Sequence, residues 1–113
     1  MNYMTYDEAS ELAMKAKNPE KGYKLENNTY LVNRGDYFAV RLHSTDVVRI
    51  YHDGTYVINS GGWRTVTTKD RINKYAPVYV YQRDFKWYVD SKGEKHDFSS
   101  GMKVNESGEI LNE

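Results

Sequence analysis

The segment 29–58, TYLVNRGDYFAVRLHSTDVVRIYHDGTYVI, determines the fold class, because its β-branched and aromatic residues alternate with polar ones at a period of two. Short polar breaks divide the segment, and Asp53-Gly54 is a strong hairpin signal since both residues tolerate a positive φ. Connections this short join antiparallel neighbours. The segment therefore predicts an antiparallel meander with strands at 29–32, 37–42, 47–51 and 55–58 and turns at 33–36 and 43–46.

Upstream of the meander, the sequence predicts a helix over residues 5–17. Thr5 and Glu8 have the spacing of a capping box, in which each side chain bonds the other residue's backbone. Apolar residues follow at helical spacing, with acids early and lysines late, as the helix dipole prefers. Asn18-Pro19 ends the helix, because the residue before a proline is forced out of the α region. Residues 18–26 are then expected to form a polar connector.

Downstream, residues 59–75 predict a glycine-rich loop and a short second helix, with Thr67 or Thr68 as its N-cap and Pro77 closing it. The tail 105–113 is polar and expected to be partly loose. The whole chain, 1–113, is interpreted as a single α+β domain. The remaining segment, 78–104, is expected to form a C-terminal β-hairpin region with strands at 78–81, 86–89, 95–98 and 102–104.

Composition narrows the functional classes. The 113 residues carry 16 Lys and Arg and 16 Asp and Glu, a formal net charge of zero, which argues against a histone-like basic binder and against an acidic mimic of nucleic acid. The absence of cysteine removes disulfides, thiol nucleophiles and iron–sulfur clusters. No apolar run reaches the length of a membrane span, and the polar start is not typical of a signal peptide. A small soluble domain is expected.

Eleven Tyr, three Phe and two Trp make aromatic content the unusual feature of the chain. Tyrosine is bulky and has a polar tip, so it suits a thin sheet whose faces are partly wet. One interpretation is that these are ordinary strand residues of a small β-rich domain. The alternative is a tyrosine-rich surface that recognises a protein or a nucleic acid.

The most polar segment with a candidate binding role is NSGGWRTVTTKDRIN, residues 59–73. Its glycines allow a partner to approach the backbone, Trp63 offers a stacking face, and the threonines lie where a helix N-terminus favours anions. These features are typical of a loop that contacts phosphate or nucleic acid, although the spacing is not that of a Walker A loop. The structural alternative is that Gly61-Gly62 makes a tight turn, Trp63 fills the core under the helix, and the threonines cap it.

A second cluster is Arg41-Leu42-His43-Ser44-Thr45-Asp46, in which Arg41 and His43 would share one face of a strand. A metal-assisted nuclease built from His43 and Asp46, with Asp53 or His52, is the least favoured of the functions considered. Basic residues outnumber acidic ones in 27–75 and the reverse holds in 76–113, so the central segment is the candidate for an anionic partner. The residues assigned to partner or nucleic-acid binding are Arg41, His43, Arg49, Trp63, Arg64, Thr67, Lys69 and Arg71, with no catalytic residue and no metal ligand.

The strings NNTYL (27–31), AVRLHSTDVV (39–48), DG (53–54) and SGGWRTVTTKDRIN (60–73) resemble a small family of proteins carried by phages and mobile elements. The resemblance covers roughly residues 27–75. The helical start and the tyrosine-rich last third lie outside it and are expected to be additions specific to this chain.

This resemblance implies an accessory protein that works in the cytoplasm of a bacterial host. By analogy with anti-CRISPR proteins, it implies a non-enzymatic inhibitor that binds a host defence protein or nucleoprotein such as a Cas nuclease. A small nucleic-acid-binding domain using Trp63–Arg71 is the alternative. No cofactor and no membrane contact are expected, and the oligomeric state stays open.

Overall fold

The computed structural model describes residues 3–112 and contains two helices and nine strands within that range. The strands form antiparallel sheets, so the predicted α+β class is confirmed. Neither helix is both long enough and apolar enough to cross a bilayer. In chain order the elements are α1 (Tyr6–Ala13), β1 (Tyr23–Glu26), β2 (Thr29–Asn33), β3 (Phe38–Leu42), β4 (Thr45–Ile50), β5 (Thr55–Ile58), α2 (Val66–Tyr75), β6 (Tyr79–Arg83), β7 (Lys86–Ser91), β8 (Glu94–Asp97) and β9 (Met102–Asn105).

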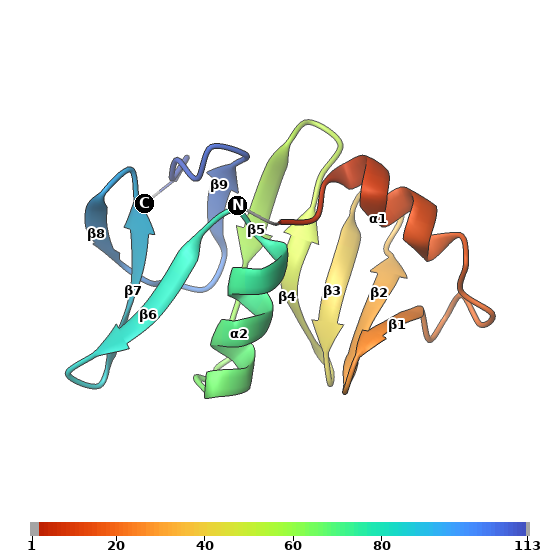
Figure 1. The fold of residues 1–113 in the computed structure, drawn as a ribbon, viewed down its shortest axis with the longest axis horizontal. Coiled ribbons are helices and arrows are strands. Elements are labelled where there is room, and N and C mark those ends of the chain that lie inside the picture. The colour runs from red at the N-terminus through yellow and green to blue at the C-terminus, as the bar shows by residue number, and fades with distance from the viewer. Residues whose placement is uncertain (1–2, 113) are drawn as a thin grey trace.

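The larger sheet has six strands in the order β1-β2-β3-β4-β5-β9, and the smaller has three in the order β6-β7-β8. Figure 1 shows the strands β1 to β5 side by side, with both helices in front of that sheet and the smaller sheet beside it. The four predicted meander strands are all present. β9 pairs with β5 and so returns the end of the chain to the first sheet, instead of joining the C-terminal hairpin region.

Two expectations for residues 5–26 need correction. The connector 18–26 contains a strand, β1, which pairs with β2 across a bulge that interrupts its alternation. The helix predicted over 5–17 ends at Ala13, because Met14, the next apolar residue, is 84% exposed and gains nothing from helical packing. In the tail 105–113, Ile110 bridges Val104 and the Leu111 amide donates to the Lys103 carbonyl at 2.8 Å, whereas residue 113 lies outside the described residues.

The start of α1 follows the predicted capping box. The Thr5 hydroxyl accepts from the Glu8 amide at 3.2 Å, and the Glu8 carboxylate accepts from the Thr5 amide at 3.0 Å. Both interactions satisfy amides that have no partner inside the helix.

One hydrophobic core lies on the side of the six-stranded sheet that the helices cover. From the sheet come Leu31, Val40 and Ile58, which the register places on one face, and from α2 comes Ile72. Trp87 of β7 belongs to the same core, which therefore joins the two sheets. We call this the inner face of the six-stranded sheet and the opposite one the outer face.

The first strand of the small sheet, β6, runs along α2, and a side chain completes its free edge. The Asn73 amide nitrogen donates to the Val80 carbonyl at 2.9 Å, and the Val80 amide donates to the Asn73 amide oxygen at 2.6 Å. Asn73 thus satisfies both backbone groups of Val80 as a neighbouring strand would.

A candidate binding pocket beside Trp63

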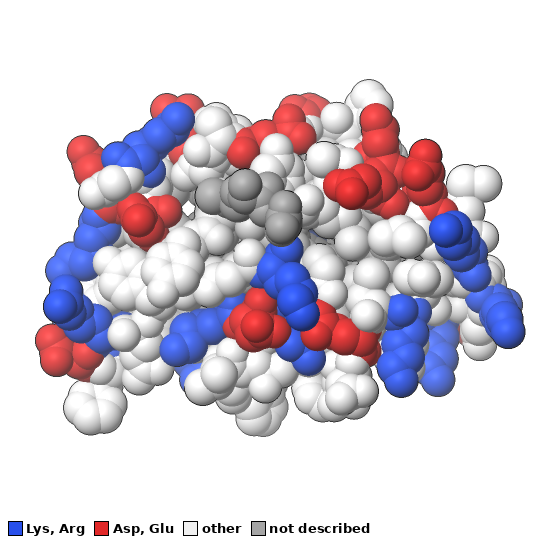
Figure 2. Space-filling model, in the orientation of Figure 1, with Lys and Arg blue, Asp and Glu red and all other residues white. Residues whose placement is uncertain are grey.

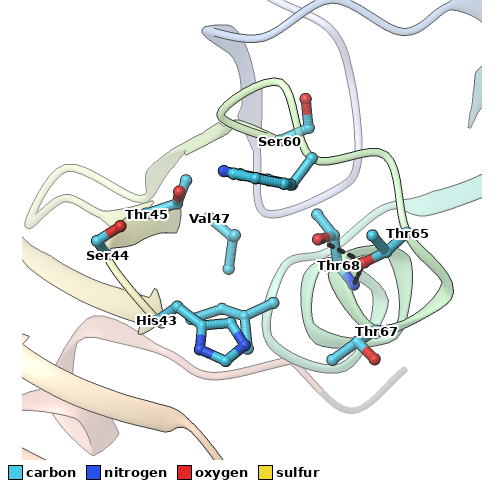
Figure 3. A pocket seen from close by; sticks show the side chains of 10 residues that line it. His43, Ser44, Thr45, Val47, Ser60, Thr65, Thr67 and Thr68 are labelled. Atoms are coloured by element: carbon cyan, nitrogen blue, oxygen red, sulfur yellow. Dashed lines mark hydrogen bonds between the residues drawn. The ribbon is translucent and has the colours of Figure 1, made fainter.

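The two segments that the sequence singles out meet at one pocket of about 430 Å³. The β3–β4 turn supplies His43 and Ser44, and the loop before α2 supplies Ser60 and Trp63. Figure 3 shows His43 and Thr45 on one side of this pocket and Thr65, Thr67 and Thr68 of the α2 start on the other. Its walls combine apolar surface from Leu42 and Val47 with side-chain hydroxyls.

A close approach between the glycine loop and β4 builds one wall. Gly61 has a φ of +61°, and a Cβ there would lie 2.6 Å from the Thr45 side chain, so a larger residue would displace the loop. The loop is held by the Asn59 side chain, which accepts from the Gly61 amide at 2.9 Å. The hydroxyls of Ser60 and Ser100 lie 3.1 Å apart and tie the loop to the segment before β9. Thr45 and Ser60 were not among the predicted site residues, although Gly61 marks the place where they meet.

The helix on the opposite wall begins earlier than predicted. Its N-cap is Thr65, whose hydroxyl accepts from the Thr68 amide at 3.1 Å, and not Thr67 or Thr68. The hydroxyls of Thr65 and Thr68 also lie 3.0 Å apart, so they satisfy each other. Within residues 3–112, the imidazole of His43 and the hydroxyl of Thr67 make no hydrogen bond to another residue. These two groups can therefore bond a ligand without breaking an internal contact.

Trp63 does not fill the core under the helix, as one interpretation of the sequence had it. Trp63 is 66% exposed at the rim of the pocket, and Val66, three residues further along the chain, is 77% exposed. The core position is taken by Trp87, which is 3% exposed. An exposed tryptophan at the rim of a pocket is apolar surface of the kind that marks an interaction site.

Two of the predicted cations lie near α2 and rest on the aromatic ring of Trp87. The Arg64 guanidinium lies 5.6 Å from the ring centroid and the Lys69 ammonium also 5.6 Å. Arg64 lies 5.2 Å from Phe98 as well. Both cations are held against aromatic rings by cation–π attraction, and neither forms an ion pair with an acid among the described residues.

Arg71, by contrast, is used inside the protein. Its guanidinium donates to the Thr29 hydroxyl at 2.8 Å, lies 3.3 Å from the Glu26 carboxylate and also contacts Asp70. Burial acts to raise the pKa of Glu26, but the hydrogen bonds from Tyr75 and Lys74 and the charge of Arg71 outweigh it, and the net shift is downward. Burial and the bond to Glu26 raise the pKa of Tyr75. This cluster fixes α2 to β1 and leaves the Arg71 charge neutralised.

Arg41 and Arg49 lie away from the pocket, on the outer face of the six-stranded sheet. The register pairs Arg41 with Tyr30 and Arg49 with Ala39, out of phase with the core residues on the same strands. The structure therefore divides the eight predicted residues: His43, Trp63 and Thr67 line the pocket, Arg64 and Lys69 lie on Trp87, Arg71 is internal, and Arg41 and Arg49 share another face.

The residues considered for a metal-dependent nuclease do not come together. Asp46 is bound by both Nε and Nη2 of Arg34, at 3.1 and 2.8 Å, and does not line the pocket that contains His43. His52 packs edge-on against Tyr6, 5.0 Å between ring centroids. Among residues 3–112, no group of three or more His, Asp or Glu side chains has an arrangement that could hold a metal ion.

Comparison with known proteins gives one match. The family model of the Kyanoviridae Gp96 protein matches residues 7–105, whereas no curated protein and no solved structure matches the chain. The match includes α1 and the C-terminal strands, so the expectation that those regions are additions specific to this chain is wrong. With most of its length covered by that model, the chain belongs to the Kyanoviridae Gp96 family of phage proteins.

Proposed function

We propose that this phage protein works without catalysis, by binding a host protein at the pocket beside Trp63, and that the bound protein is part of a host defence nucleoprotein such as a Cas nuclease. The observation that carries the proposal is the 66% exposure of Trp63 at the rim of a pocket whose walls are uncharged apart from His43 and partly apolar. Tryptophans of this kind dominate the binding energy of protein interfaces when a partner covers them.

The chemistry of the pocket supports a protein partner more than a phosphate. Its lining contains no lysine or arginine, and Leu42 and Val47 form apolar parts of its wall. The His43 imidazole and the Thr67 hydroxyl, which make no internal hydrogen bond, can bind one polar group of the partner and so orient the side chain that enters the pocket. A pocket that combines uncharged hydroxyls with apolar surface, and that a tryptophan also lines, fits an aromatic or aliphatic anchor residue.

The alternative, a nucleic-acid site on Trp63–Arg71, is favoured by one observation. Arg64 and Lys69 lie on the same ring, that of Trp87, so two cations of this segment lie close together. Arg71 contributes no free charge to it, because Glu26 and Asp70 pair with its guanidinium. This leaves a modest electrostatic footprint.

The experiment is capture of a host protein by the tagged chain, with and without nuclease treatment, followed by reconstitution with the purified partner. We expect a nuclease-resistant, stoichiometric complex that weakens at least about tenfold in Trp63→Ala. Phe85→Ala is the matched control, since Phe85 is 95% exposed in the β6–β7 turn and does not line the pocket.

Inhibition is then measured as the nuclease activity of the purified target with wild type or Trp63→Ala added. A complex that disappears after nuclease treatment, and that is weakened by Arg64→Ala and Lys69→Ala, would replace this proposal with the nucleic-acid alternative. A complex that Trp63→Ala leaves intact would overturn the pocket as the contact.

A further inference from the structure

The outer face of the six-stranded sheet has no second layer in the described part of the chain. Both helices lie against the inner face: Ala9 of α1 and Ile72 of α2 are in the core cluster. The second sheet joins that same core through Val80 and Trp87. The outer face is therefore a broad antiparallel surface that no other described element covers, and its larger side chains, such as Tyr30 and Arg41, are partly exposed.

Tyrosine and basic side chains make up much of this surface. On β2 and β3 the register places Tyr30 opposite Arg41. The Arg41 guanidinium lies 5.4 Å from the centre of the Tyr30 ring, and the Lys21 ammonium lies 5.5 Å from it. Lys24 of β1 is the other neighbour of Tyr30 in the register. Three cations thus surround one half-buried tyrosine.

A second group lies further along the same face. The Arg49 guanidinium lies 5.1 Å from the centre of the Tyr37 ring, and Tyr37 lies 5.2 Å from Tyr51, ring to ring. Between the two groups, Val32 and Ala39 are 3% and 0% exposed. These small apolar residues form a floor under the tyrosine and arginine side chains, so the rings are supported from below.

The charge of the face is not cancelled internally. Among the strand residues that the register places there, the acid is Asp46, and Arg34 already binds it. The Arg49 Nε is buried and has no hydrogen-bond partner among the described residues, so the protein does not hold this guanidinium through that atom. Lys103 of β9, opposite Val57 in the register, adds a further cation.

We propose that this outer face binds single-stranded nucleic acid, with bases stacked on Tyr30 and Tyr37 and phosphates held by Arg41, Arg49 and Lys24. The charge complementarity selects a polyanion, and the aromatic rings select one whose bases are unpaired, because a base inside a duplex cannot reach a tyrosine ring. Arginine stacks on an aromatic ring and still presents its N–H groups to a phosphate. This proposal is independent of the pocket, since none of these residues lines it.

The test is fluorescence anisotropy with labelled oligothymidine and oligouridine of about 15 nucleotides, within the usual site sizes of such surfaces. A duplex of the same length is the comparison. We expect the single strands to bind more tightly than the duplex, with affinity falling steeply between about 50 and about 200 mM salt.

Variants locate the site. Arg41→Gln combined with Arg49→Gln is expected to weaken binding at least about tenfold and to flatten the salt dependence. Tyr30→Ala is expected to weaken it about five- to tenfold, whereas Tyr30→Phe keeps the ring and the affinity. Lys24→Ala is an additional variant at an exposed residue, where loss of fold is not a concern.

The matched control is Tyr88→Ala with Lys95→Ala, which removes a similar pair from the smaller sheet, where the Lys95 ammonium lies 4.7 Å from the Tyr88 ring centre. This control and Trp63→Ala should bind as wild type does. The proposal is overturned if wild type fails to bind either single strand at low salt. It is also overturned if duplex binds as well as single strand, or if the outer-face variants bind normally. Retention of a host protein that Tyr30→Ala releases, without nucleic-acid binding, would assign the face to a protein instead.

Discussion

The two faces of the six-stranded sheet use the same residue types in opposite ways. On the inner face, Tyr56 is 1% exposed and its hydroxyl donates to the Met4 carbonyl at 2.7 Å, while burial raises its pKa. Arg71, which covers that face from α2, is bound by Glu26 and Thr29. On the outer face, Tyr30 and Arg41 stack on each other at the surface. The role of a tyrosine or arginine here follows from its place in the fold, which is its phase in the strand alternation for Tyr30, Arg41 and Tyr56 and its position on α2 for Arg71, and not from its type.

Two neighbours on β5 give the largest contrast between the faces. Ile58 points into the core and is 0% exposed, whereas Val57 is on the outer face and half-buried. We expect Ile58→Ala to lower the free energy of unfolding by about 3 kcal/mol, since it leaves a cavity. Val57→Ala should cost less than about 1 kcal/mol. Urea unfolding followed by circular dichroism measures both, and equal losses would mean that the outer face is covered in solution.

The arginines give the next largest contrast. Arg71→Ala removes the partner of a partly buried carboxylate and of the Thr29 hydroxyl, and we expect it to destabilise the fold by about 2 kcal/mol. Arg41→Ala removes a surface stack and one bond to the Lys21 carbonyl, and should cost less than about 1 kcal/mol. Thermal unfolding of the two variants beside wild type measures the difference. A loss in Arg41→Ala as large as in Arg71→Ala would contradict the division of roles.

Removal of a single tyrosine hydroxyl from each face gives a smaller contrast between the two faces. Tyr56→Phe leaves the Met4 carbonyl without its donor in a buried place, so we expect a loss of about 1 kcal/mol. In Tyr30→Phe the expected change is close to zero, because the ring of Tyr30 faces solvent and the cations. Chemical denaturation with closely spaced urea points resolves this difference, and no loss in Tyr56→Phe would mean that water replaces the bond.

The smallest effect is one of pH. Because the pKa of Glu26 is lower in the folded protein than its ordinary value of 4.5, its contribution to stability is complete above that value and is lost as the pH falls through the folded pKa. Unfolding midpoints measured from neutral pH downward should fall less steeply in Glu26→Gln than in wild type. Glu11→Gln, at an exposed acid of α1, is the control and should follow wild type.

Much of the fold could be predicted from local patterns. The meander, the Thr5–Glu8 capping box and the existence of both helices follow from short-range chemistry that the structure repeats. β1 was missed because its four residues are too few for their alternation to stand out in a polar segment, and the pairing of β9 with β5 was missed because it joins residues far apart in the sequence. The early start of α2 at Val66 reflects a choice among several adjacent threonines that differ only in tertiary context.

Individual residues of the pocket could be predicted from the sequence, but the pocket itself could not. The sequence indicated His43 and Trp63 separately, and nothing local shows that the β3–β4 turn lies across from α2. The tyrosines were counted in the sequence without being placed on a face. Their phase in the strands relative to Leu31 and Val40 was sufficient to predict that Tyr30 and Tyr37 lie together on the opposite face. The sequence assigned Arg71 to partner binding, and its internal role could not be predicted because its partner Glu26 lies far away in the chain.

The hydrogen bonds of Asn73 to Val80 affect how readily the protein aggregates at high concentration. A sheet edge with free N–H and C=O groups is a template on which the strand of another chain can add, and such addition propagates into aggregates. By bonding both groups of Val80, the Asn73 amide closes that position of β6 to intermolecular pairing. The segment after β9 does the same for the last strand of the larger sheet. One side-chain amide and one short stretch of chain thus oppose the aggregation of a small, strand-rich protein.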